Sequence, residues 1–430
     1  MIGVAAILSR AATAAARTTG VGFISHGPRS VSQPSLPFRL FCANNGPNAN
    51  PVALQMINYA ISLARSRKSD ESYAQASLVL EQCLSTQHDE NSKGMVLLAM
   101  SSLLSERGNI EEAIEKLQRI QDLTLSSIGV RVATTEALVG LHLELEQDDA
   151  SSVLADICVR LLDTIKLEIG GGCGSGVLDG RTKALKGLVE LLHGNLQSAE
   201  SLFQGAQENK DCSGNVALSY GEFLHATRNL SMAKELYEKV IQGMFENKDF
   251  GDPCNLAACN MTSEEVLLAA TCALGQLEAH LGNFGDAEDI LARALTKAEQ
   301  HFGSHHPKVG VVLTCIALMF RQKAMVEHSS SLLIQEGLYR RAIDLLKAPP
   351  LETEVGAETK FHRRDIVALA RGGYGETLYI QQNRKAEGER LKSWAESVWR
   401  NHRMSLAEAL DISKSSSKLP VIDARISRVV

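Results

Sequence analysis

The chain has few of the residues that build β-sheet cores and membrane spans. Only 5% of its 430 residues are aromatic, and just two are tryptophan, Trp394 and Trp399. A core poor in aromatic residues and rich in Ala and Leu is typical of helices rather than of β-sandwiches or barrels. The longest apolar run, Val309 to Phe320, is shorter than the roughly 20 residues that a transmembrane helix needs. We therefore predict an all-helical protein without a transmembrane segment.

Acidic residues are absent from the start of the chain. No Asp or Glu precedes Asp70, although the whole chain carries 50. Residues 1–41 contain only four charged residues, all of them arginine: Arg10, Arg17, Arg29 and Arg39. An Arg-rich, Ser-rich, acid-free segment with amphipathic potential is typical of an organellar transit peptide. Since Arg39-Leu40-Phe41 before Cys42 resembles the processing site of matrix-targeted proteins, we predict a mitochondrial transit peptide over residues 1–41. A plastid transit peptide and a merely disordered segment are the alternatives.

The predicted mature chain is acidic. Without the four arginines of residues 1–41, 40 basic residues remain against 50 acidic ones, and the net charge is −10. Proteins that bind nucleic acid without sequence preference neutralise phosphates with Lys and Arg. Nucleic acid is therefore not expected as a partner.

Motifs of enzymes and cofactor sites are missing. The nine cysteines contain no CxxC pair, so we interpret them as small, buried apolar residues in a reducing compartment. Gly174 and Gly180-Arg181-Thr182 differ from a P-loop in spacing and in having Arg instead of Lys. His301, His305 and His306 have a spacing that could hold a metal, but a polar connection between helices is the favoured interpretation. No catalytic, cofactor or metal site is expected, and the protein is predicted not to be an enzyme.

Four segments repeat one pattern. A small residue in a Leu-rich stretch is followed seven residues later by a turn, then by Ala and, four residues on, by a bulky residue. The pairs of small residue and Ala are Ser101 and Ala113, Gly187 and Ala199, Gly221 and Ala233, and Gly275 and Ala287. Each pair is predicted to lie where the two antiparallel helices of a hairpin come closest, since a larger side chain there would overpack the contact. The bulky residue is predicted to fill the groove between one hairpin and the next.

This pattern resembles the tetratricopeptide repeat (TPR). The resemblance implies an all-α solenoid, a right-handed superhelix of about eight antiparallel helix hairpins, whose first helices line a concave surface that binds segments of other proteins. The connection His301–Pro307 resembles that of the longer repeats of kinesin light chains. The predicted mature chain also resembles plant mitochondrial TPR proteins of the kind linked to root growth.

Weaker copies of the pattern extend the array over the rest of the chain. The predicted organisation is a set of N-terminal hairpins over 51–168, a Gly-rich loop over 169–180, a central array over 181–346, a C-terminal basic hairpin over 347–403 and a polar tail over 404–430.

Positive charge gathers in one part of the chain. Residues 360–403 carry ten basic residues against five acidic ones. A solvated face is one interpretation; a docking site for an acidic partner or for peripheral contact with an anionic membrane surface is the other. The candidate patch consists of Arg363, Arg364, Arg371, Lys392, Trp394 and Trp399. For the two tryptophans the favoured interpretation is that they close the end of the array, and the exposed patch is the alternative.

Together these patterns predict a non-enzymatic adaptor of the mitochondrial matrix that holds or assembles other proteins. Chaperones, respiratory complexes and iron–sulfur assembly proteins are the classes of client considered. The alternatives are a regulatory subunit of a mitochondrial enzyme, and an organellar RNA-binding helical-repeat protein of the pentatricopeptide kind, whose groove would be basic.

Overall fold

A computed structural model describes residues 50–169, 175–207, 214–246, 258–328, 331–351, 362–411 and 418–430. All of them belong to one compact unit, Phe38–Val430. The predicted transit peptide, residues 1–41, lies outside the described residues.

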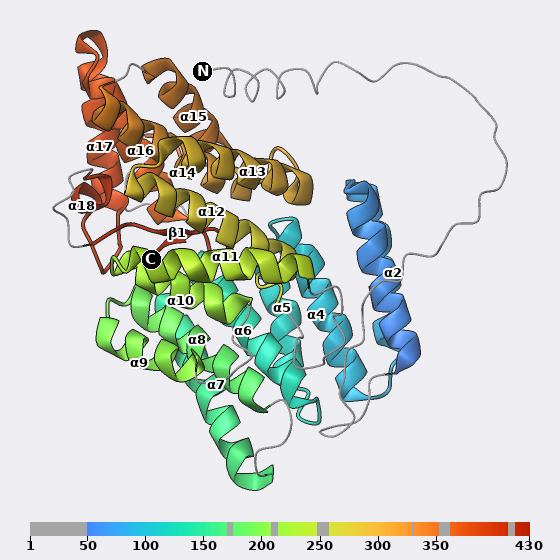
Figure 1. The fold of residues 1–430 in the computed structure, drawn as a ribbon. Helices are drawn as coiled ribbons and strands as arrows, with labels where there is room; N and C mark the ends of the chain where they lie inside the picture. Colours follow the sequence, from blue (N-terminus) through green and yellow to red (C-terminus); the bar gives the residue numbers. More distant parts are fainter. Residues whose placement is uncertain are drawn as a thin grey trace, which may run out of the picture. The chain divides into compact units, whose positions relative to one another are not determined.

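Eight antiparallel helix hairpins follow one another along the described chain, as predicted (Figure 1). The first four pairs are α2 (Pro51–Arg67) with α3 (Asp70–Thr86), α4 (Glu90–Glu106) with α5 (Ile110–Gln121), α6 (Ile128–Glu144) with α7 (Asp148–Ile169), and α8 (Ser175–Leu192) with α9 (Leu196–Gln207). The last four are α10 (Asn215–Ala226) with α11 (Leu230–Glu246), α12 (Ser263–Leu281) with α13 (Phe284–Phe302), α14 (Pro307–Glu327) with α15 (Leu332–Leu345), and α16 (Arg364–Tyr379) with α17 (Lys385–Val398). A 3₁₀ turn η2 (Gln382–Arg384), the short helix α18 (Leu406–Leu410) and two short strands, β1 (Ile422–Asp423) and β2 (Arg428–Val429), complete the described elements.

The hairpins stack so that their helices form two layers. The first helix of each hairpin contacts the first helix of the next, from α2 against α4 through to α14 against α16. We call these first helices the inner helices (α2, α4, α6, α8, α10, α12, α14 and α16) and their partners the outer helices. The protein is thus an all-helical solenoid, in agreement with the sequence prediction.

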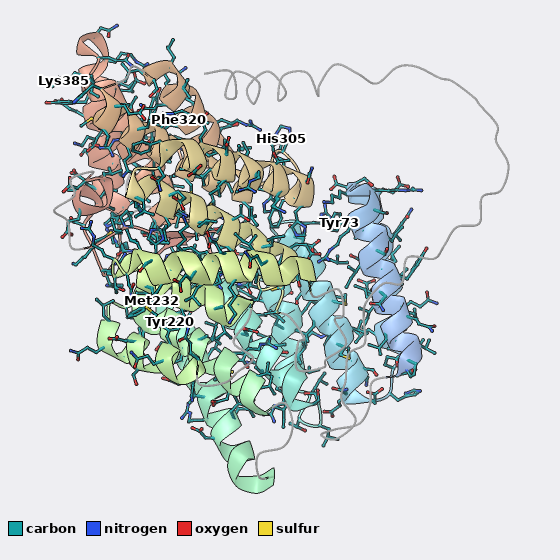
Figure 2. All side chains as sticks on the ribbon, viewed as in Figure 1. Tyr73, Tyr220, Met232, His305, Phe320 and Lys385 are labelled. Carbon is teal, nitrogen blue, oxygen red and sulfur yellow. The ribbon has the colours of Figure 1, made fainter. Side chains whose placement is uncertain are left out.

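Burial differs between the two layers. The outer helix α5 buries a single stripe, formed by Ile110, Ala113, Ile114, Leu117 and Ile120. On another outer helix, α11, the side chain of Met232 is 43% exposed (Figure 2). The inner helices α10, α12, α14 and α16 are buried on nearly all sides. A helix buried all round has structure on both faces, so something other than the outer layer covers the inner helices.

Four tight turns connect the helices of the best-matched hairpins. Gly108, Gly194 and Gly282 have φ of +79°, +80° and +87°, and Arg228 takes the same role with φ +69°. The asparagine after each of them donates its backbone N–H to a carbonyl five residues back, as from Asn109 to Leu104 at 2.9 Å. These bonds satisfy carbonyls at the end of the first helix. The left-handed backbone there explains why Gly recurs at this point of the repeat.

The glycine of each repeat lies directly against the bulky side chain of the second helix in the same hairpin. A Cβ on Gly221 would lie 2.7 Å from Cε1 of Tyr237, and one on Gly187 would lie 2.9 Å from Cζ of Phe203. Gly275 faces Leu291 in the same way, at 2.6 Å. The bulky residue therefore packs over the glycine of its own hairpin. Phe203 also reaches the next hairpin, as predicted, with its ring centre 5.8 Å from that of Tyr220 and 5.4 Å from that of Phe223. Ser101 and the four alanines of the pattern (Ala113, Ala199, Ala233 and Ala287) are fully buried.

One helix in the described part of the chain, α14, is long and apolar enough to cross a membrane by those two criteria alone. Its most apolar window is 61% buried, and it lies between α12 and α16. Its apolar composition is that expected of an inner helix covered on both faces.

The Gly-rich connection is shorter than predicted. Helix α7 continues to Ile169 and α8 begins at Ser175, so the second half of the predicted loop 169–180 is helical; residues 170–174 lie outside the described residues. Burial of Leu178 and the ion pair of Arg181 with Glu136 on α6 fix the start of α8. This tertiary packing overrides the low helix propensity of glycine.

Candidate peptide-binding groove

Two segments that are not helical cover the inner face of the inner helices. One is residues 258–261, before α12, and the other is residues 418–430, which contain β1 and β2 (Figure 1). The second segment is a correction to the prediction, which made residues 404–430 a polar tail outside the array. Every residue from Val421 to Val430 is buried.

Residues 421–430 form a small antiparallel hairpin. Ile422 pairs with Val429 and Asp423 with Arg428, and the N–H of Val430 donates to the carbonyl of Val421 at 2.8 Å. Ser427 turns the chain with φ +53°. An isolated two-stranded hairpin has little stability in water, so this one owes its conformation to the helices around it.

Polar side chains of the inner layer bind the backbone of this hairpin. The side-chain amide of Gln276 on α12 accepts from the N–H of Ile422 at 2.8 Å and donates to its carbonyl at 3.0 Å. Nζ of Lys308 on α14 donates to the carbonyl of Ala424 at 2.8 Å. Past the end of α17, Asn401 donates to the carbonyl of Val429 at 2.7 Å. These contacts recognise a peptide backbone whatever its side chains.

Arg425 is fully buried beneath the inner helices. Its guanidinium is bound by the carboxylate of Glu222 on α10, by Asp423 at 2.8 Å and by the hydroxyl of Ser219 at 3.1 Å. The side chains of Arg425, Glu222 and Asp423 are all 0% exposed. Burial raises the pKa of the Glu222 carboxyl, against the opposing effect of Arg425. Two carboxyl groups thus share one guanidinium in a site without solvent.

Arg428 is bound three residues further on. Its Nε donates to Asp365 at the start of α16 at 3.0 Å, and Nη1 donates to Asp148 at the start of α7 at 2.9 Å. Nη1 also donates to the carbonyl of Leu143 at the end of α6 at 3.0 Å. One arginine therefore joins the third hairpin to the eighth. Charge-assisted, multidentate contacts of this kind select a guanidinium over an ammonium group.

Further carboxyl groups of the groove have shifted pKa values. Burial alone would raise the pKa of Glu144, but Lys308 and Arg363 lower it to about 2. Burial raises the pKa of Glu146 to about 7, with Arg428 opposing and Asp365 adding to the rise. The Glu144 carboxyl is therefore ionised at neutral pH, whereas the Glu146 carboxyl titrates close to neutral pH.

Apart from Arg363, which was expected on an exposed patch, none of these groove residues was predicted from the sequence. The signal that could have indicated them is a charged residue within an otherwise apolar inner helix, such as Glu222 between Gly221 and Phe223. The second signal is the short apolar and charged alternation of residues 421–430, which is a strand pattern.

Four of the six residues of the predicted surface patch are buried, whereas the side chains of Arg364 and Lys392 are 40% and 38% exposed. Arg363, Arg371, Trp394 and Trp399 are between 4% and 9% exposed. The guanidinium of Arg371 stacks 3.8 Å from the centre of the Trp394 ring, and Nε1 of Trp399 donates to the carbonyl of Met404. Both tryptophans therefore pack at the end of the array, which was the favoured interpretation, and not in an exposed patch.

The basic residues of 360–403 are largely bound within the chain. Arg363 pairs with Glu144, Arg364 with Glu146, and Lys392 with Glu376. Arg384 pairs with Glu336 and Glu387. Local charge counting missed these pairs because most of the carboxylates lie in other hairpins.

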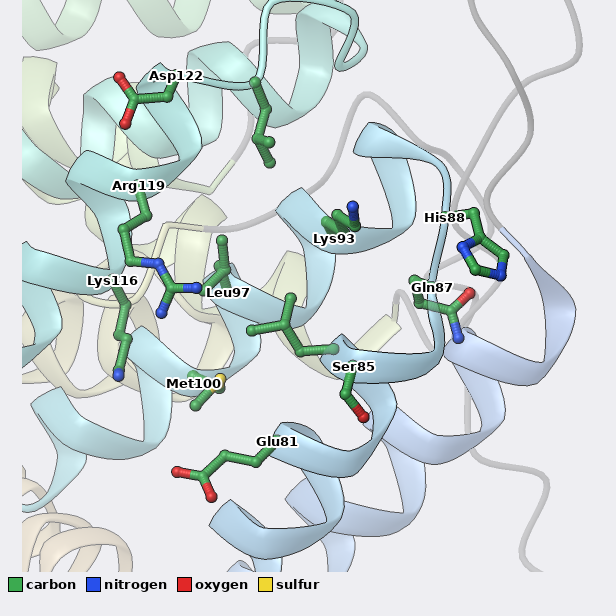
Figure 3. Close-up of a pocket in the computed structure, with 12 residues that line it drawn as sticks. Glu81, Ser85, Gln87, His88, Lys93, Leu97, Met100, Lys116, Arg119 and Asp122 are labelled. Atoms are coloured by element: carbon green, nitrogen blue, oxygen red, sulfur yellow. The ribbon is translucent and has the colours of Figure 1, made fainter.

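A second hollow lies outside the groove, between α3 and α5, and measures about 780 Å³ (Figure 3). Leu97 and Met100 of α4 are buried at its floor. Its rim carries Lys93, Lys116 and Arg119 together with Glu81 and Asp122. The mixed charges and the apolar floor describe a gap between two outer helices rather than a catalytic pocket.

Two of the three histidines considered as metal ligands, His301 and His306, have structural contacts, and His305 is exposed. His306 caps α14 by accepting the N–H of Lys308 at its Nδ1, at 3.1 Å. Its ring stacks on Phe302, which also meets the edge of the His301 ring. No group of metal-binding side chains was found within the described residues.

The described cysteines are buried and free, as predicted for small apolar residues: Cys83, Cys158, Cys259, Cys272 and Cys315. Cys42, Cys173, Cys212 and Cys254 lie outside the described residues. Sγ of Cys272 on α12 lies 3.5 Å from Sγ of Cys315 on α14, which places the two thiols at the contact of neighbouring inner helices.

The family comparison concerns the sixth hairpin. Residues 267–308, which comprise most of α12, all of α13 and the connection to α14, match a family model described as "Tetratricopeptide repeat". The hairpin matches a TPR. The seven other hairpins of the described chain follow the same two-layer arrangement. Arrays of such repeats present an extended surface to other proteins, so the TPR-like fold is that of a protein-interaction scaffold.

Three solved structures are similar to the chain at low identity. BtubC (BKLC) from P. vanneervenii has 14% identity and TM-score 0.41, with 59% of this chain and 90% of that chain covered. The Rap protein complexed with Competence and Sporulation Factor has 12% identity and TM-score 0.38, with 79% and 100% covered. Yeast Tom70 has 13% identity and TM-score 0.29, with 82% and 93% covered. No curated protein matches the chain.

Proposed function

We propose that this protein is a mitochondrial scaffold that performs no chemistry itself and holds segments of other proteins in the groove of its inner helices. The observation that carries the proposal is the hairpin 421–430 in that groove, bound through its backbone by Gln276, Lys308 and Asn401. Side chains that bind a peptide backbone and a buried guanidinium are the elements of a peptide-recognition site.

The mitochondrial part of the proposal is supported by the sequence alone. Residues 1–41 are Arg-rich and acid-free, and the mature chain resembles plant mitochondrial TPR proteins linked to root growth. Within the matrix, the scaffold would hold or assemble chaperones, respiratory complexes or iron–sulfur assembly proteins.

Proximity labelling in intact mitochondria tests both parts. The full chain is fused to a labelling enzyme after Val430, and a fusion of residues 1–41 alone to the same enzyme is the control for location. The proposal expects both fusions inside mitochondria, and a set of neighbours for the full chain that the control lacks. Import of the control into plastids, or identical neighbours for the two fusions, contradicts the proposal.

A further inference from the structure

The groove of the inner helices is a binding site whose occupant is part of the same chain. The hairpin 421–430 contacts the inner helices of five different hairpins. The contacts come from Leu143 on α6, Glu222 on α10, Gln276 on α12, Lys308 on α14 and Asp365 on α16. Arg428 makes the contacts with both α6 and α16. None of these five helices needs the hairpin for its own antiparallel pairing, because each packs on its own outer helix.

Two arginines of the hairpin 421–430 make its ion pairs with the groove. Arg425 and Arg428 are three residues apart and enter separate acidic sites, one formed by Glu222 and the other by Asp365 and Asp148. Buried ion pairs add little net stability compared with apolar packing, but the loss of one partner is costly because the other charge stays buried. The groove is therefore built to discriminate between occupants more than to be filled by any apolar segment.

The site is also acidic beyond the ion pairs that it makes. Glu222 has one carboxylate oxygen, Oε1, that is buried without a hydrogen bond, and Asp365 has another, Oδ1. Glu144 lies beside both Lys308 and Arg363 and accepts from the Arg363 guanidinium. Unused acceptors next to a bound guanidinium favour ligands that bring additional donors.

We propose that the groove is a receptor for protein segments that present two arginines at i and i+3 in a tight turn, and that residues 421–430 occupy it as an internal ligand. The proposal rests on the scaffold function and names the class of segment that the scaffold takes. Partner segments of this chemistry bind by displacing the internal hairpin. Because the internal ligand is tethered, its effective concentration is in the millimolar range. The apparent affinity for a partner is therefore the affinity of the open groove multiplied by the fraction of chains in which the groove is open.

The test compares the binding of a labelled synthetic peptide, residues 418–430, to full-length chains by fluorescence anisotropy. In the Arg425→Ala/Arg428→Ala chain the internal ligand is weakened, and this chain is expected to bind the peptide at least tenfold more tightly than the wild-type chain. A peptide with both arginines replaced by alanine is expected not to bind either chain. Adding Glu222→Gln and Asp365→Asn to the double variant is expected to abolish binding of the arginine peptide.

Circular dichroism establishes first that the double variant is helical. If it fails to fold, Arg428→Lys takes its place, since Lys keeps the charge and loses the three-way contact with Asp365, Asp148 and Leu143; a threefold gain in peptide affinity is then expected. A folded variant with no gain, equal binding of the alanine peptide, or unfolding of both variants would make the hairpin a fixed part of the core and overturn the proposal. Partners recovered by proximity labelling despite that result would leave the scaffold function standing and reject this inference alone.

Discussion

Gly221 shows how strictly one residue of the repeat is determined. A Cβ at this position would lie 2.7 Å from the ring of Tyr237, which is fully buried and hydrogen-bonded through its hydroxyl to His225. The ring has no space to move, so Gly221→Val should overpack the hairpin and lower the free energy of unfolding by roughly 2 kcal/mol or more. Urea unfolding followed by circular dichroism measures the change.

The matched control is Gly243 on α11 of the same hairpin. A Cβ there would meet no atom within 4 Å. Since Val and Gly differ by only about 0.4 kcal/mol in helix propensity, Gly243→Val should leave the unfolding free energy nearly unchanged. Equal effects of the two substitutions would mean that the close approach of α10 to Tyr237 is not what limits Gly221.

Glu265, near the start of α12, makes stability depend on pH. Burial raises its pKa to about 8, Lys308 opposes the rise and Glu144 adds to it; Oε2 has no hydrogen-bond partner. The folded protein holds this proton while the unfolded chain releases it near pH 4.5. The contribution of Glu265 to the free energy of unfolding is therefore fully present below pH 4.5. It decreases by roughly 1.4 kcal/mol per pH unit as the pH rises and is lost at about pH 8.

Glu265→Gln should remove that contribution. The difference in unfolding free energy between the variant and the wild type should shift in favour of the variant from pH 5 to pH 8 and become constant above pH 8.5. Urea titrations at four pH values in this range provide the comparison. A difference that does not change with pH would show that Glu265 is ionised in the folded protein throughout.

At the scale of elements, the position of residues 258–261 depends on one glycine. This glycine is Gly140 on α6, and a Cβ there would lie only 1.7 Å from Nδ2 of Asn260. Gly140→Val should therefore expel this segment from the groove and expose Cys259, which is 2% exposed. We expect maleimide labelling of Cys259, followed by mass spectrometry, to become at least tenfold faster.

Two comparisons make the Gly140 result specific. Cys83, at 0% exposure on α3, should stay protected in the same sample unless the whole array unfolds. Gly337→Val on α15, where a Cβ meets nothing within 4 Å, should leave Cys259 protected. Slow labelling of Cys259 in the Gly140 variant would mean that the segment has another way to pack.

The sequence predicts the hairpins well because their determinants are local. The turn at Gly108-Asn109 and the pairing of Gly221 with a nearby outer helix depend on residues within about 20 positions of one another. The groove was not predicted because its contacts are not local. Arg428 is 280 residues from Asp148, and no spacing rule connects them. Residues 360–403 appeared to be a free basic surface for the same reason.

At the scale of the whole molecule, the hairpin 421–430 changes how the array should unfold. An array of repeats in contact only with neighbours behaves as a one-dimensional chain, in which separate parts unfold separately. Here Arg428 connects the third hairpin to the eighth, and Arg425 connects the fifth to the same segment. These contacts between distant repeats should merge the unfolding of the described array into a single cooperative transition.

The two tryptophans of the chain allow this to be measured. Trp394 lies on α17 and Trp399 directly follows it, and no other tryptophan occurs in the sequence, so fluorescence reports on the eighth hairpin while circular dichroism reports on all helices. In urea, the two signals should change together in the wild type, as a two-state transition requires. In the Arg425→Ala/Arg428→Ala chain the eighth hairpin loses the connection to the third that Arg428 makes and keeps only the pairs of Arg363 with Glu144 and of Arg364 with Glu146. Its fluorescence transition should therefore separate from the helical one. Arg131→Ala, which removes an exposed arginine from α6, is the control that should keep the transitions together. Coincident transitions in the double variant would mean that contacts between neighbouring hairpins alone make the array cooperative. The hairpin 421–430 would then not contribute to the cooperativity of unfolding.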